Sequence, residues 1–352
     1  MFHAALVLAA CCIAPPPAVA PPAASQPAAP DPMAAIIAPE SRVEHIATGL
    51  KFSEGPVWVP ATADAPGRLL FSDINADTIY AWTPPADGQA VTPARPRPVP
   101  GADDSVPEVP ALEVFRRPSR HANGLRLDRE GRLLICEHDG RVIRLERDGA
   151  VKILAEAFQS RSLNSPNDLC VGADGSVYFT DPPYGLRPPM GAPGRTREID
   201  FSGVYRITPE GNLVLIEREL RTPNGIALAP DGRTLYVADH GKGSILAYAV
   251  GADGTVDPSS RRGFATTAGE DGRPRGADGV RVDAAGNVFA ATRAGVMVFA
   301  PSGERLGVIP LPDRAGATNI CFGGPEGATL YITAAADVYR VALRTRGARP
   351  RP

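Results

Sequence analysis

Apolar and polar positions alternate along most of the chain in one short, recurring pattern. In five segments a polar residue precedes a run of alternating apolar positions, a Gly stands eight residues later, and a second apolar run follows. The polar residue and the Gly of each segment are Asn123 and Gly131, Asn167 and Gly175, Asn224 and Gly232, Asp278 and Gly286, and Asn319 and Gly327. The alternation predicts a strand with one buried face, and the Gly supplies the left-handed turn position of a hairpin.

A sixth, looser copy of the pattern begins at Glu54 and reaches its turn near Gly67. Each copy continues into further strand-like sequence, so that one unit holds roughly four strands. Repeats of this length and strand content are typical of radial architectures. We therefore predict an all-β fold, a six-bladed β-propeller of four-stranded blades, over residues 42–346.

The composition agrees with this fold class. Of the 352 residues 43% are hydrophobic, and 36 Gly and 38 Pro supply the turns that many short strands need. The formal net charge is −2 and no basic block stands out, so we expect no nucleic-acid partner. Outside the leader, the cysteines lie singly in apolar runs and predict no disulfide framework; they are Cys136, Cys170 and Cys321.

The two ends of the chain read differently from the repeats. A short apolar run at 4–10 precedes Cys11, and Pro/Ala-rich sequence follows it. Small residues before such a cysteine are typical of a lipoprotein signal, and an ordinary secretory signal is the alternative. We expect a leader at 1–20, a linker at 21–41 and a disordered tail at 347–352. The protein is then exported, and is either periplasmic or anchored to a membrane by a lipid on Cys11.

Radial geometry predicts where the polar lead residues of the repeats lie. The first strand of each blade lines the central channel, so the residue just before it lies at one rim of that channel. The six lead residues are Glu54, Asn123, Asn167, Asn224, Asp278 and Asn319. A ring of oxygen-bearing side chains suits Ca²⁺, which takes 6 to 8 oxygen ligands, whereas the lack of His and Cys disfavours zinc. The alternative is that these residues only begin turns, although turns alone do not require Glu54.

The second strand of each blade returns to the same rim. Tyr184 follows one such strand, and Glu137 and Asp181 end two of them, so all three are candidate substrate contacts. For the two acids, turn formation is the alternative. His121, two residues before Asn123, is a further candidate contact or a rim histidine without a role. An insertion at 186–201 follows one of these strands, and we expect it to cover the channel mouth.

Five short motifs resemble the gluconolactonase/senescence-marker-protein family, which includes regucalcin. The resemblance spans about residues 45–345, and the motifs are SEGPVW at 53–58, SPNDL at 165–169, FTDPPYG at 179–185, TPNGIAL at 222–228 and ADGVRVD at 277–283. It implies a six-bladed propeller that holds a divalent cation, usually Ca²⁺; Zn²⁺, Mn²⁺ or Mg²⁺ is the alternative. By motif position the ligands are Glu54, Asn167, Asn224 and Asp278.

The same resemblance implies a hydrolase that opens sugar or related lactones. Asn167 matches a position that contacts substrate as well as metal, and Asp278 matches the catalytic acid/base. Asn123 and Asn319 are in phase with the ring without matching usual ligands, so we expect polar lining, with Asn123 near substrate. Ser165 stands where animal members carry Arg, which leaves the identity of the lactone open.

We expect the cation to act as a Lewis acid and Asp278 as the general base, with a nucleophilic carboxylate as the alternative. Two other functions stay open. One is phosphotriesterase-like or other hydrolysis on the same scaffold, and the other is a propeller that binds a ligand without catalysis.

Overall fold

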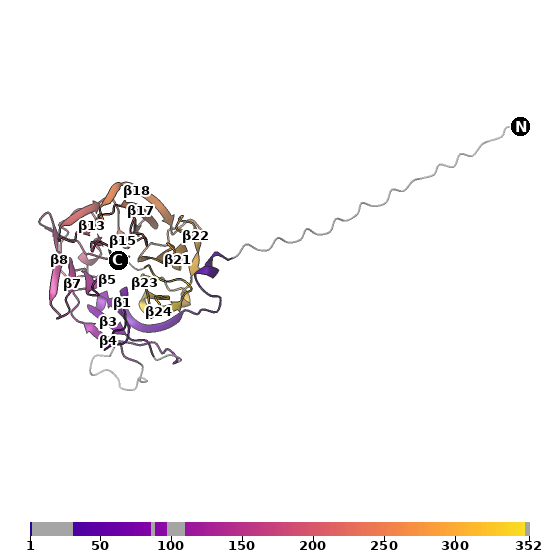
Figure 1. Cartoon of the computed structure of the whole chain (residues 1–352), viewed down its shortest axis with the longest axis horizontal. Coiled ribbons are helices and arrows are strands. Elements are labelled where there is room, and N and C mark those ends of the chain that lie inside the picture. The colour runs from indigo at the N-terminus through magenta and orange to yellow at the C-terminus, as the bar shows by residue number, and fades with distance from the viewer. Residues whose placement is uncertain (2–30, 86–88, 97–109, 270, 349–352) are drawn as a thin grey trace. The chain divides into compact units, whose positions relative to one another are not determined.

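The chain folds into an all-β propeller with four-stranded blades (Figure 1). The structure is a computed structural model that describes residues 1, 31–85, 89–96, 110–269 and 271–348. The propeller belongs to the compact unit that begins at Pro32. No helix of the described residues is long and apolar enough to cross a membrane.

Four sheets of four antiparallel strands each come from consecutive stretches of chain. The first contains β5 (Ala122–Leu127), β6 (Leu133–Glu137), β7 (Arg141–Leu145) and β8 (Val151–Ala155). The second contains β11 (Leu169–Val171), β12 (Val177–Asp181), β13 (Gly203–Ile207) and β14 (Leu213–Glu217). The third contains β15 (Pro223–Leu228), β16 (Thr234–Asp239), β17 (Ser244–Val250) and β18 (Val256–Thr266). The fourth contains β19 (Val280–Val282), β20 (Val288–Thr292), β21 (Gly295–Phe299) and β22 (Arg305–Ile309).

A six-stranded sheet joins the two ends of the propeller sequence, in the order β23-β24-β1-β2-β3-β4. Its strands are β23 (Asn319–Gly323), β24 (Thr329–Ala342), β1 (Glu44–Val59), β2 (Arg68–Asp73), β3 (Thr78–Trp82) and β4 (Glu113–Arg116). The remaining elements are the ribbon of β9 (Ala157–Phe158) with β10 (Arg161–Ser162) and four 3₁₀ turns, η1 (Pro32–Ala35), η2 (Ile74–Ala76), η3 (Tyr184–Leu186) and η4 (Pro312–Arg314).

The sheet count of five around the axis differs from the six blades that the repeats predict. The reason is that β1 has two partners. Its first half pairs with the end of β24, from Glu44 opposite Arg340, whereas its second half pairs with β2, from Ser53 opposite Asp73. The register shifts between Thr48 and Ser53, so one long strand carries hydrogen bonds in two directions.

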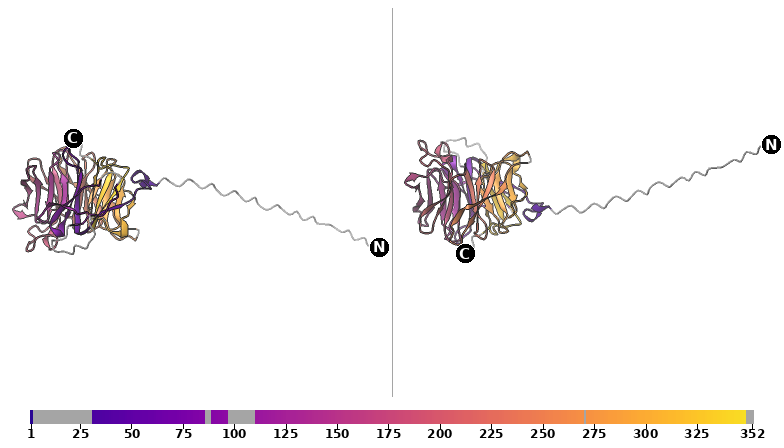
Figure 2. Two further views of the ribbon diagram at one scale, coloured as in Figure 1. Left: turned by 90° about the horizontal axis from the view of Figure 1, so that it is seen from below. Right: turned by 90° about the horizontal axis from the view of Figure 1, so that it is seen from above.

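Inner strands surround one axis in chain order. β1 neighbours β5, β5 neighbours β11, β11 neighbours β15, β15 neighbours β19, β19 neighbours β23, and β23 returns to β1. Figure 1 shows the outer strands β4, β8, β18 and β22 at the rim, and Figure 2 shows the sheets standing side by side around the axis. Apolar side chains fill the spaces between neighbouring sheets, as Leu134 and Phe179 do. This packing fixes the direction in which each inner strand presents its side chains.

The predicted hairpin turns are confirmed. Each repeat Gly has a positive φ that L-residues rarely adopt, and these glycines are Gly131, Gly175, Gly232, Gly286 and Gly327. The three cysteines of the propeller are buried and free, as expected. The first strand of each of these hairpins is an inner strand, so the residues that lead the repeats lie together around the channel.

The chain segments that flank the propeller are more structured than we expect where they are described. Ile36, within the expected linker, is 2% exposed in an apolar cluster, and its carbonyl accepts the amide of Arg344 at 2.9 Å. Gly347 and Ala348 donate backbone hydrogen bonds to Gly327 and Val282. The leader with Cys11, most of the linker and residues 349–352 lie outside the described residues.

Candidate metal and catalytic site

Glycines bring neighbouring lead residues into contact. A Gly follows the lead residue in four of the six repeats, and a Cβ on any of them would collide with the next lead residue. Measured from that Cβ position, the distances are 1.8 Å from Gly55 to Asn123 O, 2.6 Å from Gly124 to Asn167 O, 2.2 Å from Gly225 to Asp278 O and 2.1 Å from Gly279 to Asn319 Oδ1. The absence of a side chain at these positions lets the inner strands converge.

Hydrogen bonds complete the circle. Thr180 joins two lead residues, because its carbonyl accepts Asn167 N at 2.8 Å and its hydroxyl donates to Asn224 O at 2.7 Å. Asn319 Nδ2 donates to Glu54 Oε2 at 3.0 Å across the seam between the two ends of the sequence. All six lead residues therefore lie in one closed ring, which we call the oxygen ring.

Several oxygens of this ring are buried without a hydrogen-bond partner. They are Asn123 Oδ1, Asn224 Oδ1 and Asp278 Oδ1. A buried polar oxygen without a partner is costly, and a bound cation satisfies it. Amide and carboxylate oxygens are the ligands that Ca²⁺ prefers. The residues present therefore fit a hard divalent cation.

The two carboxylates of the ring raise each other's proton affinity. Burial raises the pKa of Glu54 to about 7, against the hydrogen bonds from Gly55 and Asn319 that lower it. Burial and then the negative charges of Glu54 and Asp168 raise the pKa of Asp278 well above its usual range. Two acids that disfavour each other's ionisation are what a divalent cation would neutralise.

An ion pair lies directly beside the ring. Asp168 follows Asn167 in sequence, and its two carboxylate oxygens accept Arg281 at 2.8 and 3.2 Å. Both side chains are buried and the partners lie 113 residues apart in the sequence. The pair joins two different sheets, because Asp168 directly precedes β11 and Arg281 lies in the middle of β19.

A neutral histidine connects the ring to the 186–201 insertion. Asn123 Nδ2 donates to His138 Nε2 at 3.0 Å, and His138 Nδ1 donates to the carbonyl of Met190 at 2.8 Å. Burial lowers the pKa of His138 to about 4, so this tautomer persists at neutral pH. The insertion also contacts Asp139 through the amide of Ala192 and is packed against the propeller at Ile199.

A second histidine lies beside Asp278. His240 Nδ1 is 3.8 Å from Asp278 Oδ2, and the imidazole is half-buried. The ring of Tyr184 stands edge-on to His240 with centroids 6.5 Å apart, and the Tyr184 hydroxyl is buried without a partner. Burial and then the charge of Asp278 raise the pKa of that hydroxyl. Tyr184, His240 and Asp278 therefore share one side of the rim.

The other predicted contacts have partners of their own. Glu137 is fully buried against Arg116, Arg120 and Arg141, which leaves its carboxylate engaged in an ion network. Asp181 accepts the amides of Asn164 and Ser165 at 2.9 and 2.7 Å. These contacts favour structural roles for the two acids.

His121 stays near the rim. Its Nδ1 is 3.1 Å from Asp139 Oδ1, and Asp139 also accepts the amide of Ala192 in the insertion. The backbone of His121 has φ 54, and its amide donates to Asp77 Oδ1 at 2.8 Å. Asp77 thus holds a strained rim residue in place.

Sequence reasoning overlooked His138, His240 and the Asp168–Arg281 pair. Both histidines follow the last residue of a second strand, Glu137 and Asp239, so the phase of the repeat carried a signal for them. The ion pair had no such signal, because it joins two sheets. No group of three or more His, Cys, Asp or Glu side chains suited to a metal occurs among the described residues. The oxygen ring combines two carboxylates with amides instead.

Comparison with known proteins identifies the family. The profile of the SMP-30/Gluconolactonase/LRE-like region matches residues 52–336. The gluconolactonase of Zymomonas mobilis is 34% identical over 331 residues, which cover 89% of this chain and 84% of that protein. A solved gluconolactonase from Xanthomonas campestris is 31% identical with a TM-score of 0.72, covering 88% of this chain and 92% of its own.

A more distant likeness extends the fold comparison. The calcium-binding protein regucalcin from Agrobacterium tumefaciens is 18% identical with a TM-score of 0.66, covering 89% of this chain and 97% of its own, and it shares the fold. The profile match and the similarity to two gluconolactonases all point to the same protein family. The chain belongs to the SMP-30/gluconolactonase/LRE-like family.

Proposed function

We propose that this protein is a gluconolactonase-like lactone hydrolase whose oxygen ring holds one divalent cation. The observation that carries the proposal is the set of buried ring oxygens without hydrogen-bond partners, from Asn123, Asn224 and Asp278. Its relatives include a gluconolactonase at 34% identity. A propeller that only binds a partner has no need for acids and amides around its axis.

The propeller has six blades in this proposal, with the six-stranded sheet counting as two. Two observations support this count. The end of β24 turns back on itself, because Leu343 N donates to Ala328 O at 2.8 Å. Tyr331 and Val338 of β24 also pack in one apolar cluster with Phe71 of β2, so parts of one sheet face each other as neighbouring blades do.

The cation would be held by Glu54, Asn167, Asn224 and Asp278. Ca²⁺ suits this set best, because carboxylate and amide oxygens are its ordinary ligands, and Zn²⁺ prefers nitrogen and sulfur. A calcium-binding propeller of the same fold supports the choice. Mg²⁺, Mn²⁺ and Zn²⁺ are the ions to compare with it.

Different side chains of this protein have different roles in the proposed reaction. When bound, the cation would polarise the lactone carbonyl and stabilise the developing negative charge. Asp278 accepts the proton of the attacking water. His240, 3.8 Å from one of its carboxylate oxygens, orients Asp278. Asn123, Tyr184 and His121 line the rim that the substrate would contact.

The experiment is a screen of aldonolactones, with glucono-δ-lactone first, in a proton-release assay of the purified protein. Hydrolysis should be lost after chelation and restored by Ca²⁺. Asp278→Asn keeps the shape of the side chain and should lower kcat by about 10²-fold or more, the usual scale for losing a general base. Asp200→Asn, an exposed position in the insertion, is the matched control.

Three outcomes would contradict the proposal. They are activity that survives exhaustive chelation, an Asp278→Asn variant that turns over lactones at the rate of the wild type with cation bound, and hydrolysis of phosphotriesters in place of lactones.

We also propose that the protein is exported and lipidated at Cys11. The leader lies outside the described residues, so this proposal rests on the sequence around Cys11. Metabolic labelling with a palmitate analogue should mark the full-length protein and leave Cys11→Ala unlabelled. A labelled Cys11→Ala protein, or an unlabelled wild type, would rule out the anchor.

A further inference from the structure

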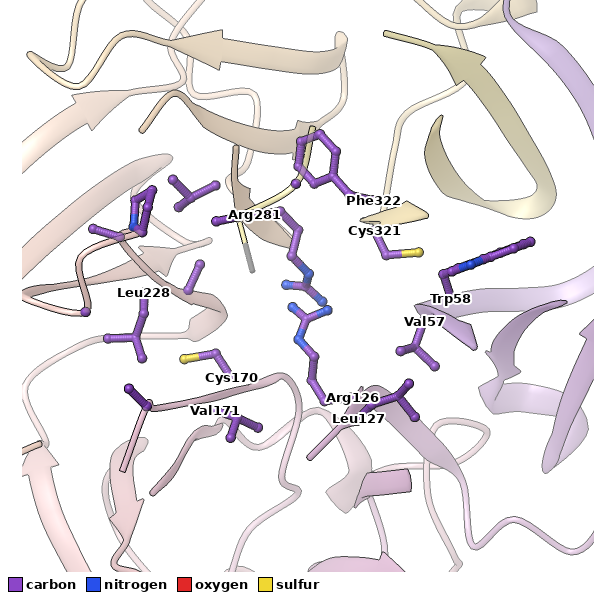
Figure 3. Close-up of a pocket in the computed structure, with 18 of the residues that line it drawn as sticks. Val57, Trp58, Arg126, Leu127, Cys170, Val171, Leu228, Arg281, Cys321 and Phe322 are labelled. Atoms are coloured by element: carbon purple, nitrogen blue, oxygen red, sulfur yellow. The ribbon is translucent and has the colours of Figure 1, made fainter. Parts of the chain in front are cut away.

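The repeat that builds the oxygen ring also builds a second level of the channel. Three residues after each lead residue, the inner strands present Val57, Arg126, Cys170, Ala227, Arg281 and Phe322, which line one cavity of about 280 Å³ (Figure 3). Strands rise about 3.3 Å per residue, so this level lies roughly 10 Å from the ring along the axis. Four of these six positions are apolar, and the two that are not are both arginines.

The two arginines face each other across this cavity. Arg126 lies on β5 and Arg281 on β19, and these strands stand on opposite sides of the channel with their guanidinium groups directed toward one another (Figure 3). Other described residues of the lining close the space around them. Leu228 and Trp58 supply apolar walls, and Ala348 also lines the cavity.

The positive charge of the arginine pair is only partly balanced. Asp168 pairs with Arg281 at 2.8 Å. Arg281 is buried, with 5% of its surface exposed, and its Nε has no hydrogen-bond partner. Among the described residues, no hydrogen bond or ion pair reaches Arg126, so two guanidinium groups share one carboxylate.

The other titratable groups of the cavity do not supply the missing charge. Burial raises the pKa of the Cys170 and Cys321 thiols to about 12, so both are neutral. Asp231 is exposed at the lining, and among the described residues no ion pair joins it to either arginine. Burial and the charge of Arg281 lower the pKa of Arg126 to about 10, which leaves it protonated at neutral pH. Two like charges in an apolar chamber repel each other unless an anion separates them.

We propose that Arg126 and Arg281 bind a small inorganic oxyanion, of the class of sulfate or phosphate, at the end of the channel remote from the oxygen ring. Guanidinium groups present planar pairs of donors that match oxyanion geometry, which favours this class over a halide. Arg126, which has no partner among the described residues, supplies donors from one side of the cavity, and the guanidinium group of Arg281 faces it from the other (Figure 3). The anion site uses neither the cation nor Asp278 as a ligand, so its test does not rest on lactone hydrolysis.

The test titrates sulfate into the purified full-length protein by calorimetry and follows the Tm in parallel, against chloride at equal ionic strength. Binding to the wild type should saturate, and sulfate at ten times its Kd should raise the Tm by about 3 °C. Arg126→Gln should weaken sulfate binding by at least tenfold. Arg262→Ala removes an exposed arginine of β18 and should bind as the wild type does, which corrects for the general stabilisation that sulfate gives proteins.

The variant also separates a binding role from a structural one. In sulfate-free buffer Arg126→Gln should have a Tm equal to or above that of the wild type, because it removes the repulsion. An equal loss of Tm in both buffers would mean that Arg126 is structural and would overturn the proposal. So would absent saturation in the wild type, unchanged affinity in Arg126→Gln, or a chloride effect as large as that of sulfate. Arg281 is left intact, because its removal strands Asp168 without a partner.

Discussion

The two levels of the channel come from the same strands and carry opposite charge. At the oxygen ring the inner strands present two carboxylates and four amides, whereas three residues further along they present two guanidinium groups among apolar side chains. The same inner strands carry both levels, and the side chains at each phase set the charge there. A propeller repeat therefore fixes where a site is, and the residue at each phase decides which ion it attracts.

Asp168 interacts with both levels of the channel. It stands one position after the ring and neutralises one of the two arginines below it. Its charge also raises the pKa of both ring carboxylates, Glu54 and Asp278. The levels are thus coupled electrostatically, and changes at one should be felt at the other.

The largest expected effect is on the Asp168–Arg281 ion pair. Asp168→Asn leaves Arg281 buried without a counter-charge and should lower the free energy of unfolding by about 3–5 kcal/mol. Denaturant unfolding measures the loss. Adding Arg281→Met to the same protein removes the stranded charge and should recover most of the stability. A single variant as stable as the wild type would show that Arg281 does not need Asp168 as its counter-charge.

Acid should remove the contribution of His138 to stability. His138 has a pKa of about 4 in the folded protein and an ordinary value of 6.5, so its neutral form contributes stability above pH 6.5. That contribution is lost as the pH falls from 6.5 toward 4, and it amounts to about 3 kcal/mol. Urea midpoints at pH 7.5 and pH 4.5 measure it.

The control for this loss is the His138→Gln variant, which should lose less stability between the two pH values than the wild type. Equal losses in both proteins would place the acid sensitivity elsewhere.

The smallest expected effect concerns a ring residue that we do not assign as a ligand. Asn319→Ala removes the hydrogen bond that orients Glu54 and should weaken cation binding by about tenfold, the scale for partners of metal ligands. Calcium titration by calorimetry measures the change, with the exposed Asn212→Ala as control. Unchanged affinity would mean that Glu54 needs no support or does not bind the cation.

Sequence patterns were sufficient to predict the structural features that recur in every repeat. The phase from lead residue to turn Gly fixed both the hairpins and the ring, because alternation has a period of two and leaves no other register that buries the apolar face. The lead residues Glu54 and Asn319 meet as that phase requires, although they begin and end the propeller sequence.

Features that join different repeats could not be predicted in this way. The Asp168–Arg281 pair depends on how two sheets are rotated toward one axis, and no local pattern records that rotation. His240 follows the end of its second strand, the phase at which Tyr184 was a candidate, so the repeat held the signal for it and sequence reasoning passed over it. The structure has five sheets around the axis where the repeats predict six blades. The reason is that β1 is hydrogen-bonded to β2 and to β24, which joins the strands on its two sides into one sheet.

The pairing of β24 with β1 determines when the cation site can form during synthesis of the chain. Glu54 is among the first propeller residues to be made, and Asn319, which completes its surroundings, is among the last. The cation site therefore cannot assemble on a nascent chain until nearly the whole protein has been translated. Before that point Glu54 belongs to an open-ended array of blades, with no partner across the seam and no complete set of ligands to retain an ion.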